Sequence, residues 1–109
     1  MHEMGITRNI VSIVTEHARG ARVKRVSLEI GKLSAVLPDA VRFCFDVCAK
    51  GTELEDADLV IIEIPGQRKC RDCQLEMQID SVYSHCLCGS WNTVATQGKE
   101  LRVKEMELV

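Results

Sequence analysis

The residues best suited to chemistry are four cysteines, in the segments CRDC at 70–73 and HCLCG at 85–89. Zinc prefers four ligands in a tetrahedron, and a CxxC turn lets two thiolates converge on one ion. Two cysteine pairs separated by 12 residues therefore predict a structural zinc site. The predicted ligands are Cys70, Cys73, Cys86 and Cys88. Four protein ligands would leave no open coordination position for a catalytic water.

The second pair has the spacing CxC, which leaves the third ligand open. His85 stands three residues before Cys88, so His85 and Cys88 also have the spacing of a zinc-binding turn. A thiolate is the usual ligand in such modules, but CxC makes a tighter turn than CxxC, and Gly89 would relieve strain just after it. We expect Cys86 to be the third zinc ligand, with His85 as the alternative.

A second group of possible ligands stands at the start of the chain, which reads MHE. The segment offers the α-amino group of Met1, the imidazole of His2 and the carboxylate of Glu3. Chain ends are usually frayed and tolerant of change. Taken alone, these three residues therefore do not predict a site.

The remaining cysteines and one further histidine fall at helical spacing. Cys44 and Cys48 lie on one apolar stripe with Phe45, where a free cysteine behaves as a small hydrophobe. His17 is predicted to lie on the inner face of the first helix as a packed, hydrogen-bonded residue. None of the three is expected to bind metal.

The elements that must position these residues alternate between helical and strand periodicity. Ile6, Ile10, Ile13, Val14 and His17 recur every three or four positions, whereas VKRVSLEIG alternates apolar and polar residues. The predicted order is a helix over 4–19, a strand over 23–31, a helix from Pro38 to near Gly51, and strands over 58–64 and 100–108.

In the last predicted strand, the apolar residues switch from one face to the other partway along. Leu101 and Val103 share one face, whereas Met106 and Leu108 fall on the other. A bulge near Glu105, or a change in which face is covered, would reconcile the two halves. The alternating charges of KELRVKEMEL are expected to form the solvated side of this strand.

Residues 66–99 lack a helical pattern and are poor in large aliphatic side chains, so burial alone could not stabilise them. The predicted fold is therefore α+β, with a two-helix, three-stranded domain over 1–65 plus 99–109. An inserted zinc-ribbon module covers 66–98. The flanking strands 58–64 and 100–108 are expected to belong to one sheet.

Composition excludes several classes of protein. The chain has 109 residues, 46% hydrophobic and 28% charged, with a net charge of −2. A nucleic-acid binder would normally show a basic face, and no apolar run is long enough to span a membrane. The start also lacks the pattern of a signal peptide. We therefore expect a cytoplasmic protein, in which six cysteines indicate metal binding or packing rather than disulfides.

The combination of features resembles the HypA/HybF family of hydrogenase maturation nickel metallochaperones. The resemblance covers essentially the whole chain. The matching pieces are MHE before a helix, RVSLEIGKLSAVLPDAVRFCFD (25–46), CRDC (70–73), CGS (88–90) and GKELRVKEMEL (98–108). The second cysteine pair departs from the family's CPxC, because His85 stands where a cysteine is expected and the cysteine lies at position 86.

The resemblance implies a carrier of nickel cargo. Met1, through its α-amino group, His2 and Glu3 would bind one Ni(II), and the zinc module would be structural. The implied partners are a nickel-loading GTPase and the precursor of the [NiFe]-hydrogenase large subunit; some family members also serve urease. Amine and imidazole nitrogens suit Ni(II) and are available near neutral pH. The protein is expected to be a monomer or a weak homodimer.

Two other classes of function compete with this interpretation. A zinc-ribbon adaptor for a nucleic-acid or transcription complex would explain the cysteines but not MHE, and the net negative charge argues against it. A zinc deaminase needs an open zinc position and an HxE motif, and the sequence contains no HxE. No phosphate-binding loop appears either, so the protein is expected to be neither a GTPase nor another enzyme.

Overall fold

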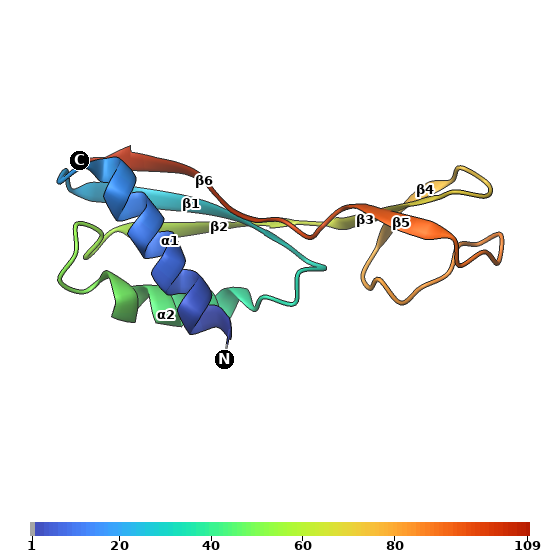
Figure 1. Cartoon of the computed structure of the whole chain (residues 1–109), viewed down its shortest axis with the longest axis horizontal. Helices are drawn as coiled ribbons and strands as arrows, with labels where there is room; N and C mark the ends of the chain where they lie inside the picture. The colour runs from blue at the N-terminus through green and yellow to red at the C-terminus, as the bar shows by residue number, and fades with distance from the viewer. Residues whose placement is uncertain (1) are drawn as a thin grey trace. The chain divides into compact units, whose positions relative to one another are not determined.

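The computed structural model describes residues 2–109 of the chain, and the side chains from Glu3 onward. Met1 and the side chain of His2, two of the three predicted nickel ligands, therefore lie outside the described part. Figure 1 shows the elements in this order: α1 (His2–Ala18), β1 (Val23–Gly31), α2 (Pro38–Ala49), β2 (Asp58–Ile64), β3 (Gly66–Cys70), β4 (Glu76–Ile79), β5 (Thr93–Gln97) and β6 (Leu101–Leu108). Neither α1 nor α2 is long and apolar enough to cross a membrane.

The chain divides into two compact units. The first unit comprises Met1–Glu29, Val36–Ile62 and Arg102–Val109, and the second comprises Ile30–Ala35 and Glu63–Leu101. Each unit is built around a three-stranded sheet, with order β2-β1-β6 in the first and β4-β3-β5 in the second. The predicted α+β class, with an inserted module, is confirmed.

The first unit packs α1 and α2 against its sheet. β2 and β6 belong to one sheet as predicted, but β1 lies between them. β1 is the central strand, so Val26 and Leu28 are completely buried. Burying such side chains stabilises a fold by about 1.5–3 kcal/mol each. The helices add further buried side chains to this core: Ile10, Val11, Val14, Ala18, Val41, Cys44, Phe45 and Ala49.

The buried face of α1 differs from the predicted one. The helix starts at His2, two residues before the predicted start, and His17 is exposed rather than on the inner face. Ile13, also predicted to be inside, is 47% exposed. Thr7 is fully buried instead, because its hydroxyl donates to the Glu3 carbonyl at 2.6 Å and needs no water. His17 does form the predicted hydrogen bond, between Nδ1 and the Ile13 carbonyl at 2.8 Å.

β6 combines a half-buried and a charged side. Val103 and Met106, three residues apart, are both half-buried and line one cavity with Ile13. Strict alternation would put them on opposite faces, so β6 departs from it, and the bulge near Glu105 stays a prediction. The charged side chains pair with β1 through Arg25–Glu107 and Arg102–Glu29. The predicted solvated side of the strand is confirmed.

The second unit contains three strands that sequence periodicity did not predict. β3 pairs antiparallel with both β4 and β5, and the pairing with β5 shifts register between Gln67 and Arg68. Three glycines let backbones approach closely in this unit. A Cβ on Gly31 would lie 1.9 Å from the Gly98 carbonyl oxygen, and one on Gly98 would lie 2.6 Å from Gly66 Cα. No larger residue fits at Gly31 without moving the backbone.

Candidate metal centre

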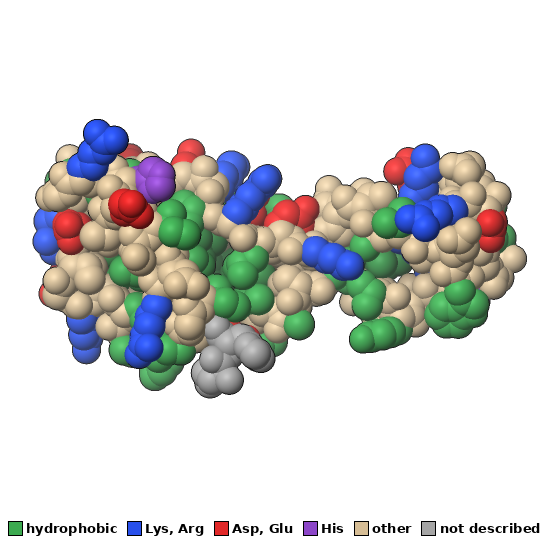
Figure 2. Space-filling view, viewed as in Figure 1, with side chains coloured by type: hydrophobic (Ala, Val, Ile, Leu, Met, Phe, Trp, Pro, Cys, Tyr) green, Lys and Arg blue, Asp and Glu red, His purple; other side chains and the backbone are tan. Residues whose placement is uncertain are grey.

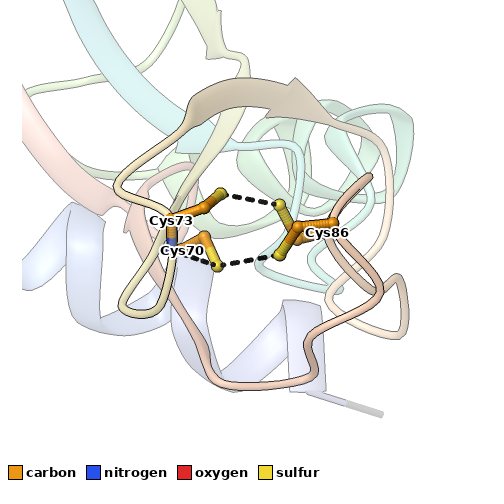
Figure 3. Close-up of side chains that lie close together, drawn as sticks. Cys70, Cys73 and Cys86 are labelled. Atoms are coloured by element: carbon orange, nitrogen blue, oxygen red, sulfur yellow. Dashed lines mark hydrogen bonds between the residues drawn. The ribbon is translucent and has the colours of Figure 1, made fainter.

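Four cysteine sulfurs converge in the second unit. The Sγ atoms of Cys70, Cys73, Cys86 and Cys88 all lie within 4.8 Å of one another. The Cys70–Cys88 pair is 3.7 Å apart and the Cys73–Cys86 pair is 3.5 Å apart. Figure 3 shows the side chains of Cys70 and Cys73 pointing toward Cys86. Cys70 and Cys86 are buried, whereas Cys73 and Cys88 are exposed at the rim.

The first pair of sulfurs is positioned by the turn that ends β3. The N–H of Cys70 donates to the Leu75 carbonyl and the N–H of Gln74 donates to the Cys70 carbonyl, both at 2.9 Å. Gln74 adopts a left-handed φ of 67°, which closes this turn. The N–H of Cys73 points at Cys70 Sγ across 3.5 Å. The turn therefore directs an N–H donor at a sulfur that must carry negative charge when it binds metal.

The second pair of sulfurs is positioned by a turn around Gly89. The N–H of Gly89 donates to the Cys86 carbonyl, and the N–H of Cys86 donates to the Ser90 carbonyl, both at 2.9 Å. Gly89 has a φ of 90°, a conformation that glycine adopts without strain. The expectation that Gly89 relieves the tight CxC turn agrees with this geometry.

His85 lies outside the sulfur cluster. Its Nδ1 is 2.8 Å from the Cys86 carbonyl, and its ring meets the edge of Trp91 at a centroid distance of 5.1 Å. The side chain is exposed. Among residues 3–109, the only group of three or more potential ligands close enough to share an ion consists of the four cysteines. The structure thus groups Cys86, and not His85, with the other three cysteines, and the identity of the third ligand stays a prediction.

Polar side chains tie the two turns together. Ser90 Oγ donates to the Asp72 carboxylate, and Asn92 Nδ2 donates to the same carboxylate at 3.4 Å. The N–H of Arg71 also donates to the Asn92 carbonyl at 2.9 Å. Sequence reasoning missed this support, although Asp72 lies inside the CRDC motif. A short acidic side chain between two ligands was the available signal, since such residues accept backbone and hydroxyl hydrogen bonds in turns.

The cysteine thiols of the cluster differ in pKa because their surroundings differ. The Cys73 N–H lowers the pKa of the Cys70 thiol to about 6, against the effect of burial. The Leu75 N–H lowers the pKa of Cys73, but the sulfur of Cys86 and burial together raise it to about 12. The Ser90 N–H lowers the pKa of Cys88, and the sulfur of Cys86 outweighs that effect and raises it. Crowded thiols cannot all ionise unless a cation neutralises them.

The donor set fits zinc. With Zn–S bonds of about 2.3 Å, the edge of a regular tetrahedron is about 3.8 Å. The sulfur distances of 3.5 and 3.7 Å match that edge. Four soft thiolates also select zinc over hard cations such as Mg²⁺ or Ca²⁺. A four-coordinate ion bound by all four sulfurs would have no coordination position left for a water.

Of the three predicted nickel ligands, the structure describes the side chain of Glu3 alone. This residue lies in the first turn of α1, and its Oε2 accepts from the N–H of Leu37 at 3.4 Å, just before α2 begins. The carboxylate, half-buried, is thereby held near the start of both helices of the first unit. Nothing in the sequence pattern predicted that these two helix starts would meet.

The two cysteines of α2 are packing residues, as predicted. Cys44 is buried in the core of the first unit, and Cys48 is half-buried. Cys48 Sγ contacts Met4 Sδ at 3.5 Å, so a helix–helix contact joins α1 and α2 there. Neither cysteine belongs to a group of potential ligands within residues 3–109.

The fold and site together define a small α+β metal-binding protein with a four-cysteine, zinc-ribbon-like module. The family described as "Hydrogenase/urease nickel incorporation, metallochaperone, hypA" matches residues 1–108. A hydrogenase maturation factor HypA from Nostoc punctiforme is 58% identical over 108 residues, covering 99% of this chain and 96% of the relative. A HypA from Geotalea uraniireducens is 46% identical over 109 residues, covering 99% of each chain.

Solved structures give the same result. A structure titled "Solution structure of HypA protein" has a TM-score of 0.74 at 27% identity, covering 100% of this chain and 97% of the other. The Ni metallochaperone HypA from Helicobacter pylori has a TM-score of 0.70 at 26% identity, with 98% and 97% covered. The chain belongs to the HypA family of nickel metallochaperones.

Proposed function

We propose that this protein carries Ni(II) on its N-terminal segment and passes it, together with a partner GTPase, to the precursor of a [NiFe]-hydrogenase large subunit. The observation that carries the proposal is the family match over residues 1–108, which includes the opening MHE. The family description names nickel incorporation as the activity, and the sequence supplies nickel-type donors at that end. The protein would act by binding and transfer and would catalyse no reaction of its own.

The nickel ligands in this proposal are the α-amino group of Met1, His2 and Glu3. Nitrogen donors from an amine and an imidazole suit the square-planar preference of Ni(II). The position of Glu3 supports this assignment, because its carboxylate is held between the starts of α1 and α2. Amine and imidazole must lose their protons to bind, so acid favours release of the cargo.

The zinc ligands in this proposal are Cys70, Cys73, Cys86 and Cys88, with a structural role only. The sulfur distances support Cys86 rather than His85 as the third ligand. The nickel-binding domain would cover 1–65 plus 99–109, and the zinc-binding module 66–98. We further propose a cytoplasmic protein that is a monomer or a weak homodimer.

The test is a calorimetric Ni(II) titration of the tag-free protein beside a form with two residues added before Met1. A form with two residues added after Val109 is the matched control. We expect one nickel per chain in the native and control proteins and loss of that site in the N-terminally extended form. Zinc is quantified in all three, and we expect one per chain throughout.

Two results would contradict the proposal in different ways. Equal nickel binding by all three proteins would place the nickel away from the free terminus. No nickel binding by any of them, with zinc still at one per chain, would favour the zinc-ribbon adaptor. Glu3→Gln against Glu16→Gln then isolates the carboxylate, because Glu16 also lies on α1 but is exposed near its other end.

A further inference from the structure

A buried arginine in the second unit is not explained by the metal centre. Arg68 lies in the middle of β3 and is only 4% exposed. Its Nη1 donates to the carbonyl and the hydroxyl oxygens of Ser84, at 2.8 and 3.0 Å, and its Nη2 contacts Met77 Sδ at 3.2 Å. Its Nε is buried without a hydrogen-bond partner among residues 2–109.

Among residues 2–109, Arg68 forms no ion pair with a carboxylate. A guanidinium is always protonated, and burying an unpaired charge strongly disfavours folding. The ion pairs among residues 2–109 involve Lys24, Arg25 and Arg102, and none includes Arg68. The partners that Arg68 does have are neutral oxygen and sulfur atoms. The groups that contact the Arg68 guanidinium directly therefore supply no negative charge.

Arg68 lines a small cavity of about 140 Å³ together with a second cation, Lys99. Two residues with hydroxyl groups, Ser84 and Thr93, also line it. The remaining walls are apolar and come from Ile79, Val82 and Ala95. No carboxylate among the described residues lines the cavity, although the chain has 16 Asp and Glu residues against 14 Lys and Arg residues.

We propose that this cavity binds a compact oxyanion, a phosphate-sized or small carboxylate group, against the Arg68 guanidinium. Guanidinium and ammonium groups bind such anions through short, charge-assisted hydrogen bonds. The size of the cavity limits the ligand. Pockets for drug-sized ligands and cofactors have about 300–1,000 Å³, so a nucleotide does not fit, whereas an anion and one or two waters do.

Neutralising the charge of the thiolate cluster does not by itself explain the buried position of Arg68 beside a cavity. Cys70 follows two residues later on the same face of β3, so the guanidinium lies on the metal-binding side of the strand. A residue that only offset the charge of the thiolates would need no cavity beside it. It would also need neither Lys99 nor the hydroxyl residues around that cavity.

The test uses the zinc-loaded, full-length protein, with the ¹H–¹⁵N signals of the Arg68 Nε–H and of the Ser84 and Thr93 amides as reporters. Inorganic phosphate and acetate are titrated separately at constant ionic strength and pH. We expect saturable shifts with half-saturation at about 1–10 mM for at least one anion. The anion that saturates identifies the ligand as phosphate-like or carboxylate-like. Shifts that stay linear for both anions to about 50 mM would mean an adventitious ion only and would overturn the proposal.

Variants distinguish anion binding at a specific site from attraction by the overall positive charge of the surface. Lys99→Gln should weaken binding about two- to fivefold, as expected for loss of one exposed charge. Arg68→Gln should weaken it at least about tenfold. The matched control is Lys69→Gln, which removes the same charge from the exposed, opposite face of β3 and should leave binding unchanged.

Equal losses for Lys69→Gln and Lys99→Gln would show that only the overall charge matters and would refute the site. If Arg68→Gln fails to fold, the wild-type titration and the Lys99/Lys69 pair still decide the question. The readout needs no nickel, so failure here and failure of nickel binding at the N-terminus are distinguishable.

Discussion

The two units of this protein obtain their stability in different ways. In the first unit, large aliphatic side chains and Phe45 are buried between two helices and a sheet. Within residues 66–98, all of which the structure describes, the only buried hydrophobic residues are Cys70 and Cys86. Tyr83, Leu87 and Trp91 are instead 86%, 79% and 68% exposed, and Figure 2 shows hydrophobic side chains at the surface.

The comparison shows that the hydrophobic effect suffices for one unit and not for the other. A segment that buries little apolar surface cannot offset the conformational entropy it loses on folding. A metal ion held by the four thiolates would supply that free energy instead, since metal binding to such a site is coupled to folding.

Removing zinc should unfold the second unit and leave the first intact. Structural zinc sites contribute about 10–16 kcal/mol of apparent binding free energy, far more than the buried side chains of residues 66–98 can replace. After chelation, amide signals of β3, β4 and β5 should collapse to random-coil positions, while those of β1 and the helices persist. Adding zinc back should restore the folded signals. If the signals of the first unit were lost together with those of the second, the two units would not differ in their dependence on zinc.

The reverse experiment removes an apolar side chain from the first unit. Phe45 is 2% exposed in the core, so Phe45→Ala should lower the free energy of unfolding of that unit by about 3–5 kcal/mol. Zinc content should stay at one per chain. The exposed Phe43, on the same helix, offers the control Phe43→Ala, for which the loss should be below about 1 kcal/mol. Loss of zinc from Phe45→Ala would show that the two units do not fold separately.

The apparent zinc affinity should rise steeply with pH. With the cysteines in their folded arrangement and no metal bound, the Cys70 thiol, with a pKa of about 6, is ionised above pH 6, whereas Cys73 and Cys88, with raised pKa values, are protonated. Thiols in an unfolded chain have the ordinary cysteine pKa of about 8.5 and are also largely protonated at neutral pH. In either state Cys73 and Cys88 therefore carry protons before zinc binds. Zinc binding must release at least those two protons, so affinity should increase at least about 100-fold per pH unit between pH 6.5 and 8.

A metal-free unit that stayed folded would show a further steepening below pH 6, where Cys70 becomes protonated, whereas an unfolded unit would show the steeper dependence already at neutral pH. Competition with a chelator of known affinity at several pH values measures this slope. Calorimetry in buffers of different ionisation enthalpy counts the released protons independently. A release of fewer than two protons per zinc at pH 7 would refute the assignment of protonated Cys73 and Cys88.

Replacing Gly31 tests the close backbone contact within the second unit. In Gly31→Ala the new Cβ would lie 1.9 Å from the Gly98 carbonyl, so the backbone must move, which should destabilise the protein by about 1–3 kcal/mol. Gly5→Ala is the control, because no atom lies within 4 Å of a Cβ there. Denaturant unfolding of both variants measures the difference, and equal stability would refute the packing argument.

The smallest effect concerns the charged side of the first sheet. Glu107 pairs with Arg25 at 2.7 Å and lies 3.9 Å from Lys24, and all three side chains are substantially exposed. Exposed pairs contribute about 0.2–1 kcal/mol, so Glu107→Gln should change the free energy of unfolding by less than about 1 kcal/mol. The small difference should shrink further in high salt. A larger loss would mean that this surface stabilises the unit more than its exposure indicates.

Sequence periodicity located the elements of the first unit well. The strand at 23–31 and the helix starting at Pro38 were predicted at their observed positions. Their patterns are strong because one face is buried and the other is solvated. The predicted inner face of α1 was wrong at Ile13 and His17, which are exposed, whereas the buried face includes Thr7, whose hydroxyl donates to the Glu3 carbonyl.

The second unit was less predictable. CRDC and CxC indicated a metal, but no periodicity revealed β3, β4 and β5, which are four or five residues long and half-exposed. The choice between Cys86 and His85 also could not be made from spacing, since both fit a turn. The structure supports Cys86, because its sulfur lies with the other three cysteine sulfurs, beside the backbone hydrogen bonds around Gly89.

The sequence by itself determined the α+β order, the inserted module and the presence of a four-ligand centre, because hydrophobic periodicity and metal-ligand spacing are local properties. Only the tertiary structure decided which residues meet across the chain. The contact of Glu3 with Leu37, the fit of Gly31 against Gly98 and the unpaired charge of Arg68 are examples. Each depends on segments far apart in sequence, whose approach is set by the packing of the whole unit rather than by either segment alone.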